Sequence, residues 1–291
     1  MKNKLYSEYQ ALVEDSLEAV FKTPKKEYEV LFDAMRYSVL GGGKRLRGVL
    51  MLECGRICGL CTEQMLPFAC AIEMIHASTL IHDDLPCMDD DDYRRGKLSC
   101  HKKFGEDVAL LAGDALYAYA LHTLLLQVKK HNYIGEVCDA LTVFTGLCGA
   151  DGVFGGQILD KRYEREMCSL EQLLQLHGLK TGALFSACVR IPCILSRADA
   201  TTEKALRTYM GKLGLAFQVK DDLLDVEGSF ETLGKAVGAD ESKSTFISVL
   251  GLERSKEYLI KLVDEAKNSV ADLPENELLL WICDFVMNRN L

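Results

Sequence analysis

The chain has 291 residues, with 34 Lys and Arg against 43 Asp and Glu, a formal net charge of −9 and 48% hydrophobic residues. This length and apolar content suffice for a large buried core, which excludes a disulfide-stabilised mini-protein and a disordered chain. The acidic balance argues against a nucleic-acid-binding surface, which needs an excess of basic residues. We therefore expect a globular protein with no nucleic-acid partner.

The apolar runs and the N-terminus bear on location. No stretch reaches the roughly 18 consecutive apolar residues of a membrane span, because Asp114 and His122 interrupt the richest run, 108–128. The N-terminus enters a charged amphipathic pattern without an apolar signal core. The 12 cysteines then fit reduced thiols. We expect a soluble, cytoplasmic protein with no membrane span.

Apolar residues recur at helical spacing along most of the chain, and no run alternates as a half-buried strand does. The first two stripes are Leu5, Tyr9, Leu12, Leu17 and Val20, and then Tyr28, Leu31, Met35 and Val39.

The breaks between these runs fall where helix ends are expected. The glycines 41–43 end one helix, and Ser169 with Gln172 three residues later forms a capping box. The glycine-rich segment 149–156 is too short and too apolar for a flexible linker. The pattern predicts one all-α domain over residues 1–291.

A first acidic cluster ends an apolar helix, with six carboxylates between residues 80 and 92. Carboxylate oxygens suit hard cations, and Mg²⁺ is typically held by a few carboxylates together with substrate phosphates. Asp83 and Asp89 stand six residues apart, which places them on different faces of a regular helix. Pro86 breaks the hydrogen-bond ladder, so we expect the chain to turn there and bring Asp89 back toward Asp83.

A second acidic cluster covers residues 217–225. Asp221 and Asp225 are four residues apart and share one helical face. Two like charges at this spacing destabilise a helix unless a cation joins them, so the cluster predicts a second metal-binding position.

Basic residues accompany the carboxylates. Lys44, Arg45 and Arg47 follow the glycine turn, where backbone amides can also approach an anion. The segment is not a P-loop, because Arg45 stands where Ser or Thr is required. Metal-binding carboxylates combined with several cations indicate a polyanionic substrate, and diphosphates fit best.

Together these segments resemble the short-chain trans-prenyl diphosphate synthases, the family of farnesyl and geranylgeranyl diphosphate synthases. The matching motifs, in family order, are Gly42-Gly43-Lys44-Arg45-Leu46-Arg47, Asp83-Asp84-x4-Asp89 with Arg94-Arg95-Gly96, Lys180-Thr181-Gly182, Phe217-Gln218-x2-Asp221-Asp222-x2-Asp225, Leu233-Gly234-Lys235 and Lys243-Ser244-Thr245. The resemblance implies a single-domain, all-α isoprenoid synthase fold with roughly ten or more helices around a central cavity, usually as a homodimer.

The resemblance also assigns roles. It implies three Mg²⁺ ions per active site, two on Asp83, Asp84 and Asp89 and one on Asp221 with Asp225. The allylic diphosphate would contact Arg94, Lys180, Thr181, Gln218, Lys235 and Lys243, and isopentenyl diphosphate would contact Lys44, Arg47, His76 and Arg95. Metals and cations would stabilise the departing diphosphate while an allylic cation forms, and the isopentenyl double bond would attack that cation. No side-chain nucleophile is needed.

Two departures from the family pattern are visible. Gly48 stands where the family usually has proline, which we expect to loosen a turn, and the segment between Lys235 and Lys243 is shorter than in many bacterial members. The second departure weakens the assignment of Lys243.

Product length depends on the wall of the cavity. In bacterial farnesyl-producing relatives the residue five before the first Asp is typically aromatic, whereas here it is Ser78, beside Thr79. Small side chains favour twenty carbons, with Met74 or Tyr117 as the next barrier. Overall resemblance to bacterial farnesyl synthases favours fifteen, so farnesyl and geranylgeranyl diphosphate both remain open.

Four other interpretations compete. Cys54, Cys58 and Cys61 match a radical-SAM spacing, but that chemistry belongs to an α/β barrel. His76 with His82-Asp83 mimics helical metal phosphohydrolases, which need further metal-binding histidines. A class I terpene cyclase has no second diphosphate to bind, and a non-catalytic synthase subunit is expected to lack one acidic motif. Both motifs are complete, so elongation is favoured.

Overall fold

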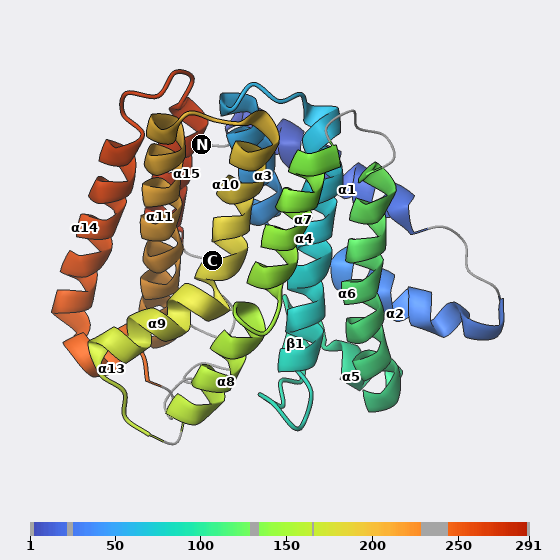
Figure 1. Cartoon of the computed structure of the whole chain (residues 1–291). Coiled ribbons are helices and arrows are strands. Elements are labelled where there is room, and N and C mark those ends of the chain that lie inside the picture. The colour runs from blue at the N-terminus through green and yellow to red at the C-terminus, as the bar shows by residue number, and fades with distance from the viewer. Residues whose placement is uncertain (1–2, 22–25, 129–133, 165, 228–243, 290–291) are drawn as a thin grey trace. The chain divides into compact units, whose positions relative to one another are not determined.

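The computed structural model describes residues 3–21, 26–128, 134–164, 166–227 and 244–289. Over these residues it is almost entirely α-helical, with more than ten helices (Figure 1), which confirms the expected fold class. One difference is a small hairpin in which β1 (Tyr93–Arg94) pairs antiparallel with β2 (Lys97–Leu98). Two-residue strands are too short to produce a readable alternation.

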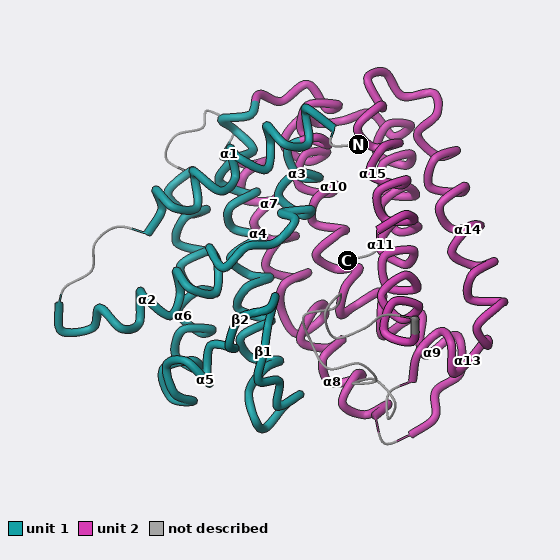
Figure 2. Tube along the Cα trace, turned by 180° about the vertical axis from the view of Figure 1, so that it is seen from behind, with its two compact units in different colours: residues 1–52, 62–134 teal, residues 53–61, 135–291 magenta. Residues whose placement is uncertain are grey.

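The chain divides into two compact units (Figure 2). Unit 1 comprises residues 1–52 and 62–134, and unit 2 comprises residues 53–61 and 135–291. Helix α3 (Leu46–Ile57) contributes to both units. One domain over the whole chain stays a prediction.

Unit 1 is built on the packing of α4 against α6. Its elements are α1 (Lys4–Val20), the 3-10 turn η1 (Lys26–Tyr28), α2 (Glu29–Val39), α4 (Thr62–Asp83), the β1–β2 hairpin, α5 (Cys100–Phe104) and α6 (Glu106–Val128). Helix α4 is buried along nearly its whole length because large apolar residues such as Phe68, Met74 and Ile75 occupy every face.

The stripe predicted for α1 was partly wrong. Its buried residues are Tyr6, Tyr9, Val13 and Leu17, so Leu5 and Leu12 lie beside the buried face and only half-buried. In α2, Met35 and Val39 are buried as predicted, whereas Tyr28 is exposed and belongs to the preceding turn.

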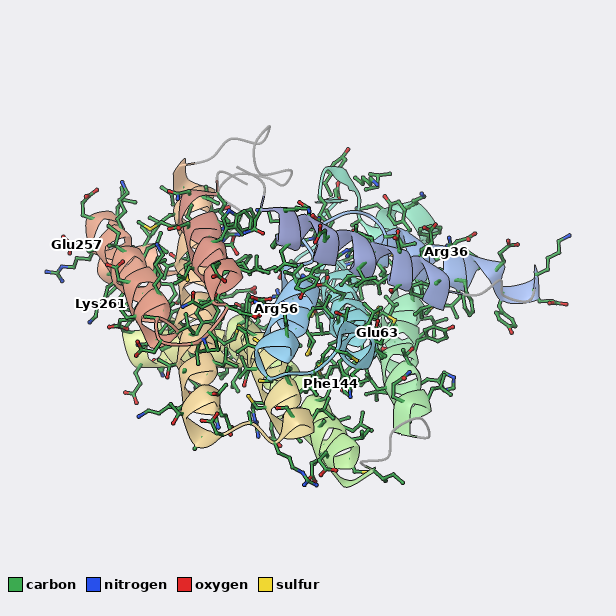
Figure 3. All side chains as sticks on the ribbon, turned by 90° about the horizontal axis from the view of Figure 1, so that it is seen from above. Arg36, Arg56, Glu63, Phe144, Glu257 and Lys261 are labelled. Atoms are coloured by element: carbon green, nitrogen blue, oxygen red, sulfur yellow. The ribbon has the colours of Figure 1, made fainter. Side chains whose placement is uncertain are left out.

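Unit 2 contains the longest helix. Its elements are α7 (Ile134–Cys148), α8 (Val153–Tyr163), α9 (Leu170–Lys180), α10 (Gly182–Ser196), α11 (Ala200–Glu227), α13 (Phe246–Leu250), α14 (Leu252–Ser269) and α15 (Glu277–Asn288). The predicted capping box at Ser169 is confirmed, and it starts α9. Helix α14 packs on α11 and has Leu259 and Leu262 buried, while Glu257 and Lys261 point outward (Figure 3).

Three helical segments are long and apolar enough to cross a membrane by length and composition: 62–83, 106–127 and 134–163. The first is largely buried inside the protein, whereas only 33% of the apolar window is buried in each of the other two. The absence of a membrane span therefore stays a prediction, and the open faces require some cover.

A buried histidine in unit 2 makes the free energy of unfolding depend on pH. His177 stacks on Phe246 with ring centroids 5.2 Å apart, and neither ring nitrogen has a partner among the described residues. Burial lowers the pKa of His177 to about 4, opposed by the charge of Asp160 and assisted by that of Lys180. The unfolded chain, with an ordinary pKa near 6.5, therefore takes up a proton that the folded protein excludes.

We expect the free energy of unfolding to be fully present above about pH 6.5 and to fall as the pH approaches 4. Between pH 7 and pH 5 His177 contributes a loss of about 2 kcal/mol. His177→Phe keeps the ring contact and removes the proton, so urea unfolding of this variant should show a pH dependence flatter by that amount. Parallel pH profiles for variant and parent would exclude this role.

Candidate active site

The first acidic motif begins where α4 ends. The helix stops at Asp83, three residues before Pro86, and the chain turns back on itself. The backbone N–H of Asp89 donates to the carbonyl of Asp83 at 2.8 Å, so these two residues lie side by side as the proline predicts. The turn therefore gathers carboxylates that a straight helix would separate.

Asp84 and Arg94, predicted as metal ligand and substrate contact, are bound to each other. The Arg94 guanidinium donates to Asp84 Oδ1 through Nε at 2.8 Å, and its Nη2 also donates to Asp91 at 2.7 Å. Asp84 is 2% exposed. Burial raises the pKa of its carboxyl, while the hydrogen bond and charge of Arg94 oppose that rise. This ion pair fixes the motif to the hairpin strand β1.

A second group of metal-type ligands stands beside this motif. Ligand atoms of Asp90, Asp92 and His101 lie within 4.8 Å of one another, the one such group of three among the described residues. Sequence spacing missed it, because the hairpin closes on itself when the Ser99 N–H donates to the Asp92 carbonyl at 2.8 Å. Lys102 Nζ lies 2.8 Å from Asp92 and partly neutralises the group.

The loop formed by glycines 41–43, called the glycine loop below, is held by hydrogen bonds from two sides. The Tyr6 hydroxyl donates to the Lys44 carbonyl at 2.6 Å and the Gln10 amide donates to the Gly43 carbonyl at 3.2 Å. Gly43 has φ +128°, and a Cβ there would lie 2.9 Å from the Arg95 guanidinium carbon. Arg95 also donates to the Gly42 carbonyl. Glycine is required here by both backbone conformation and space.

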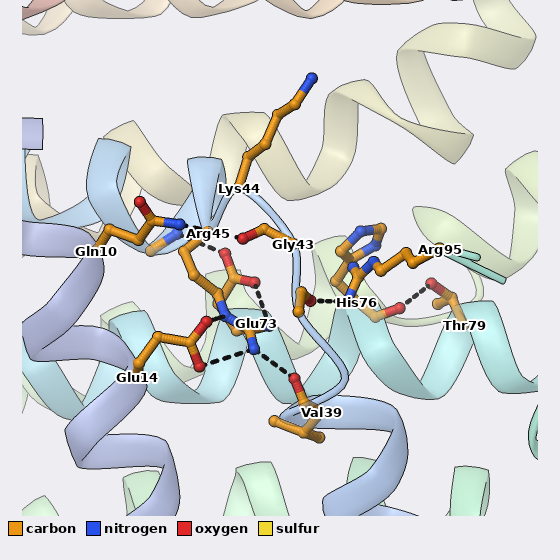
Figure 4. A network of polar contacts seen from close by, with 12 residues as sticks. Gln10, Glu14, Val39, Gly43, Lys44, Arg45, Glu73, His76, Thr79 and Arg95 are labelled. Carbon is orange, nitrogen blue, oxygen red and sulfur yellow. Dashed lines mark hydrogen bonds and ion pairs between the residues drawn. The ribbon is translucent and has the colours of Figure 1, made fainter. Parts of the chain in front are cut away.

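Arg45 is a structural residue. Its side chain is 1% exposed and pairs with Glu14 at 2.8 Å and with Glu73 at 3.6 Å (Figure 4). The same Glu73 accepts from the Gly48 N–H at 2.9 Å. The expectation that Gly48 loosens a turn was wrong. Gly48 lies inside α3 and supplies a backbone N–H donor that proline lacks.

Near this network lies the basic cluster predicted to hold isopentenyl diphosphate. Burial, followed by the charges of Arg47 and Arg95, holds the pKa of His76 well below its usual value. The imidazole is thus neutral and has one N–H to donate. Lys44 points away from the Arg45 network (Figure 4). The fold therefore brings His76, Arg47 and Arg95 together in unit 1.

The residues predicted to set product length lie along α4. Ser78 is 1% exposed, and its hydroxyl donates to the Gly113 carbonyl of α6 at 2.8 Å. Thr79 is half-buried and donates to the His76 carbonyl, and Met74 is fully buried. Ser78 therefore stands where α4 and α6 approach each other closely.

The second acidic motif lies on α11 in unit 2. Asp222 is buried, accepts from the Phe246 N–H at 2.7 Å and is 3.4 Å from the Gln218 amide nitrogen, so it anchors α13. Asp221 is half-exposed and accepts from Arg289 Nη2 at 2.6 Å, and Asp225 is 5% exposed. The carboxylates predicted as ligands, Asp221 and Asp225, are thus distinct from the structural one.

Lys180 and Thr181 approach this motif from the α9–α10 junction. Lys180 forms an ion pair with Asp160 of α8, and the Thr181 hydroxyl donates to the side-chain amide oxygen Oε1 of Gln218 at 3.1 Å. Helix α8 approaches the backbone at Lys180 closely because Gly156 has no side chain, and a Cβ there would lie 2.2 Å from the backbone nitrogen of Lys180. Unit 2 therefore gathers Lys180, Thr181, Gln218 and Asp221.

Arg289, near the end of the chain, is a residue that sequence reasoning missed. Its guanidinium lies 3.8 Å from the Phe217 ring centroid, donates to the Phe217 carbonyl at 2.8 Å and orients Asp221. No local motif marks it, because its partners are about 70 residues upstream.

We expect Arg289→Gln to raise the Mg²⁺ concentration needed for half-maximal activity by about tenfold or more, because Asp221, which the sequence predicts to bind Mg²⁺, loses its orienting donor. Arg289→Lys keeps the charge but loses the planar guanidinium over the Phe217 ring. Its required Mg²⁺ concentration should lie between those of the parent and Arg289→Gln. The check is turnover against Mg²⁺ concentration. An unchanged Mg²⁺ dependence in Arg289→Gln would show that the pair serves stability alone.

Several predicted features lie elsewhere. Lys235 and Lys243 fall in 228–243, outside the described residues. His82 Nε2 is 3.3 Å from the Leu110 carbonyl and 3.5 Å from Asp114, at the α4–α6 contact, so it serves as a helix-end hydrogen-bonding residue. The cysteines of the radical-SAM spacing form no ligand group of three among the described residues.

An all-α fold whose helix ends gather carboxylates, with guanidinium and ammonium groups close by, defines a class of enzymes that handle diphosphates. The polyprenyl synthetase family model matches residues 28–277. A farnesyl diphosphate synthase from Bacillus subtilis (strain 168) is 38% identical over 296 residues, covering 100% of both chains. A geranylgeranyl diphosphate synthase from Cyanophora paradoxa is 40% identical over 293 residues, covering 97% of this chain and 95% of its own.

A solved structure is similar to this chain as well. The crystal structure of a geranyltransferase from Helicobacter pylori complexed with magnesium and isoprenyl diphosphate has 32% identity and a TM-score of 0.85, covering 99% of this chain and 98% of that one. The chain belongs to the polyprenyl synthetase family, among the short-chain trans-prenyl diphosphate synthases. It is a prenyltransferase of the farnesyl and geranylgeranyl diphosphate synthase type.

Proposed function

We propose that this enzyme condenses isopentenyl diphosphate with dimethylallyl and geranyl diphosphate, head to tail, to make farnesyl diphosphate. The observation that carries the proposal is the neutral His76 held among Arg47 and Arg95, beside a glycine loop that carries Lys44. Several cations in one cluster suit a diphosphate, and a neutral imidazole adds a directed donor.

Each unit by itself contains residues predicted to contact the allylic diphosphate. In unit 1 the Arg94 guanidinium, fixed by Asp84, lies at the acidic turn. In unit 2 Lys180 and Thr181 lie beside Gln218. Held in place by these ion pairs and hydrogen bonds, the cations would stabilise negative charge on the leaving diphosphate with little reorganisation. The departing diphosphate itself would take the proton lost after the new bond forms.

Mg²⁺ fits the donor set, because Asp83 and Asp89 are brought side by side and are carboxylates, the ligands this ion prefers. We propose that Asp83, Asp84 and Asp89 hold two ions and Asp221 with Asp225 a third. The bound ions would neutralise diphosphate charge during ionisation. In the present arrangement Asp84 is engaged by Arg94, so its part in metal binding requires that pair to loosen.

The test is incubation of purified protein with Mg²⁺, isopentenyl diphosphate and dimethylallyl or geranyl diphosphate, followed by mass spectrometry of the products. A linear fifteen-carbon diphosphate supports the proposal. A twenty-carbon product would favour geranylgeranyl diphosphate synthesis, the alternative that the small Ser78 raises. A cyclic hydrocarbon would indicate a terpene cyclase, and no turnover would indicate a non-catalytic subunit.

We also propose a cytoplasmic homodimer that uses α6 as its interface. Leu110 and Leu111 near one end of α6, and Leu125 and Leu126 near the other, are each about half exposed. Apolar surface of this extent on one helix needs cover, and a second copy of α6 supplies a self-complementary partner. Reduced thiols fit the cytoplasm.

We expect the parent protein to run at twice the chain mass of 32.4 kDa in size-exclusion chromatography with light scattering. The double variant Leu111→Asp/Leu125→Asp should run at the single-chain mass, because two carboxylates would be buried against apolar surface. Leu98→Asp, on β2 away from α6, serves as the control and should stay dimeric. A monomeric parent would overturn the dimer.

A further inference from the structure

Prenyl transfer gives no role to Cys54, Cys58 and Cys61, and one of them, Cys58, lies close to a cysteine of another helix. Cys58 lies just beyond the last residue of α3, and Cys193 lies in the last turn of α10, both in unit 2. Their Sγ atoms are 4.0 Å apart although the residues are separated by 135 positions. The distance between two bonded sulfurs is about 2.05 Å, so the bond requires the two sulfurs to move about 2 Å closer together.

The two thiols differ in access. Cys58 is half-buried, whereas Cys193 is 4% exposed. Neighbouring Cys54 is fully buried, and burial raises its pKa well above the usual range, which keeps it an unreactive thiol. A small oxidant can therefore reach Cys58 first, with Cys193 directly behind it.

The local hydrogen bonds favour Cys58 as the attacking sulfur. Hydrogen bonds from the Cys193 thiol and from Ser196 lower the pKa of Cys58, although burial and the nearby carboxylates Asp199 and Glu203 oppose this. The Cys193 pKa is raised by its hydrogen bond to Cys58 and by burial. One member of the pair is thus the better nucleophile and the other is held as a thiol donor.

We propose that Cys58 and Cys193 form a reversible disulfide when the enzyme meets hydrogen peroxide. The Cys58 thiolate attacks one peroxide oxygen, the O–O bond breaks, and a sulfenic acid and hydroxide result. The hydroxide takes the Cys193 proton, giving water. The Cys193 thiolate then attacks the sulfenic sulfur, forming the S–S bond and expelling a second hydroxide. Peroxide is reduced, both sulfurs are oxidised, and a thiol reductant reverses the bond.

The bond would close a loop from residue 58 to residue 193 and fasten the segment 53–61 to α10 within unit 2. Cross-linking residues so far apart restricts the unfolded chain strongly. Oxidation should therefore raise the melting temperature, and dithiothreitol should restore the original value.

The test treats the full-length enzyme with increasing hydrogen peroxide, blocks remaining thiols with N-ethylmaleimide after unfolding, and maps peptides without reduction. Trypsin with a glutamate-specific protease releases residues 57–63 and residues 191–197, the second with Cys193 as its one cysteine. We expect these two peptides to appear joined, with the loss of two hydrogens. Cys61→Ser removes the other cysteine of the first peptide and should leave the joined species unchanged.

Cys58→Ser, at a half-buried position, should abolish the joined peptide and the reversible rise in melting temperature. Three results would overturn the proposal. The first is recovery of peptide 191–197 with Cys193 fully blocked by N-ethylmaleimide after peroxide has oxidised exposed Cys61. The second is persistence of the joined species in Cys58→Ser, and the third is its loss in Cys61→Ser. None of these readouts uses prenyl transfer, so the disulfide and the enzymatic function can fail separately.

Discussion

Asp83→Ala and Asp221→Ala should each lower turnover by ~10³-fold or more, because each removes a carboxylate on which the proposed metal sites depend. Asp83 ends α4 beside Asp89, so its loss leaves the turn without the first of its paired carboxylates. Asp221 is half-exposed, and its removal leaves the Arg289 guanidinium still bound to the Phe217 carbonyl. The measurement is the rate of prenyl transfer at saturating Mg²⁺.

Folding must be shown to survive in both variants. The helical signal in circular dichroism should match the parent, because neither carboxylate is a buried anchor. Asp222 is the useful contrast, since it accepts from the Phe246 N–H at 2.7 Å and Asp222→Ala should lose stability as well as activity. Asp139→Ala, exposed on α7, is the matched control and should keep full activity. Near-normal turnover in Asp83→Ala or Asp221→Ala would refute the metal assignment.

Ser78→Tyr should shorten the main product. Ser78 bonds to the Gly113 carbonyl across the α4–α6 contact, where the space is already filled: a Cβ on Gly113 would lie 2.2 Å from His82 Nε2. A phenol ring cannot remain at that contact, so we expect it to turn into the predicted cavity of the growing chain. We expect shorter diphosphates in mass spectrometry of the products, together with a lower melting temperature.

Ser78→Ala separates volume from hydrogen bonding. It frees the Gly113 carbonyl at a cost of about 1 kcal/mol and adds no bulk, so the product distribution should match the parent. An unchanged distribution in Ser78→Tyr would place the floor of the cavity elsewhere, and Met74, fully buried on the same helix, is the next position to enlarge.

The sequence by itself determined the helical class and the positions of both acidic motifs. Apolar spacing and capping signals are local, so they can be read without knowing the fold; the capping box at Ser169 is an example. The proline rule likewise foresaw the turn that returns Asp89 to Asp83. The acidic clusters together with several cations indicated a diphosphate substrate, and the order of the motifs carried the resemblance to the prenyl diphosphate synthases.

Only the tertiary structure decided which charged residues form ion pairs with one another. Arg45 follows the glycine turn just as Lys44 and Arg47 do, yet it is buried against Glu14 and Glu73. Sequence gives the identity of a charged residue and leaves its partner open, because the partner comes from a distant helix.

The same reason explains the residues that the sequence did not reveal. Asp92 meets His101 through a hairpin of two-residue strands, and Asp221 meets Arg289 from the far end of the chain. Cys58 meets Cys193 across 135 positions. The hairpin brings Asp92 to His101, and the packing of helices brings the other two pairs together. In each case the partner comes from another segment of the chain, so local sequence patterns do not reveal it.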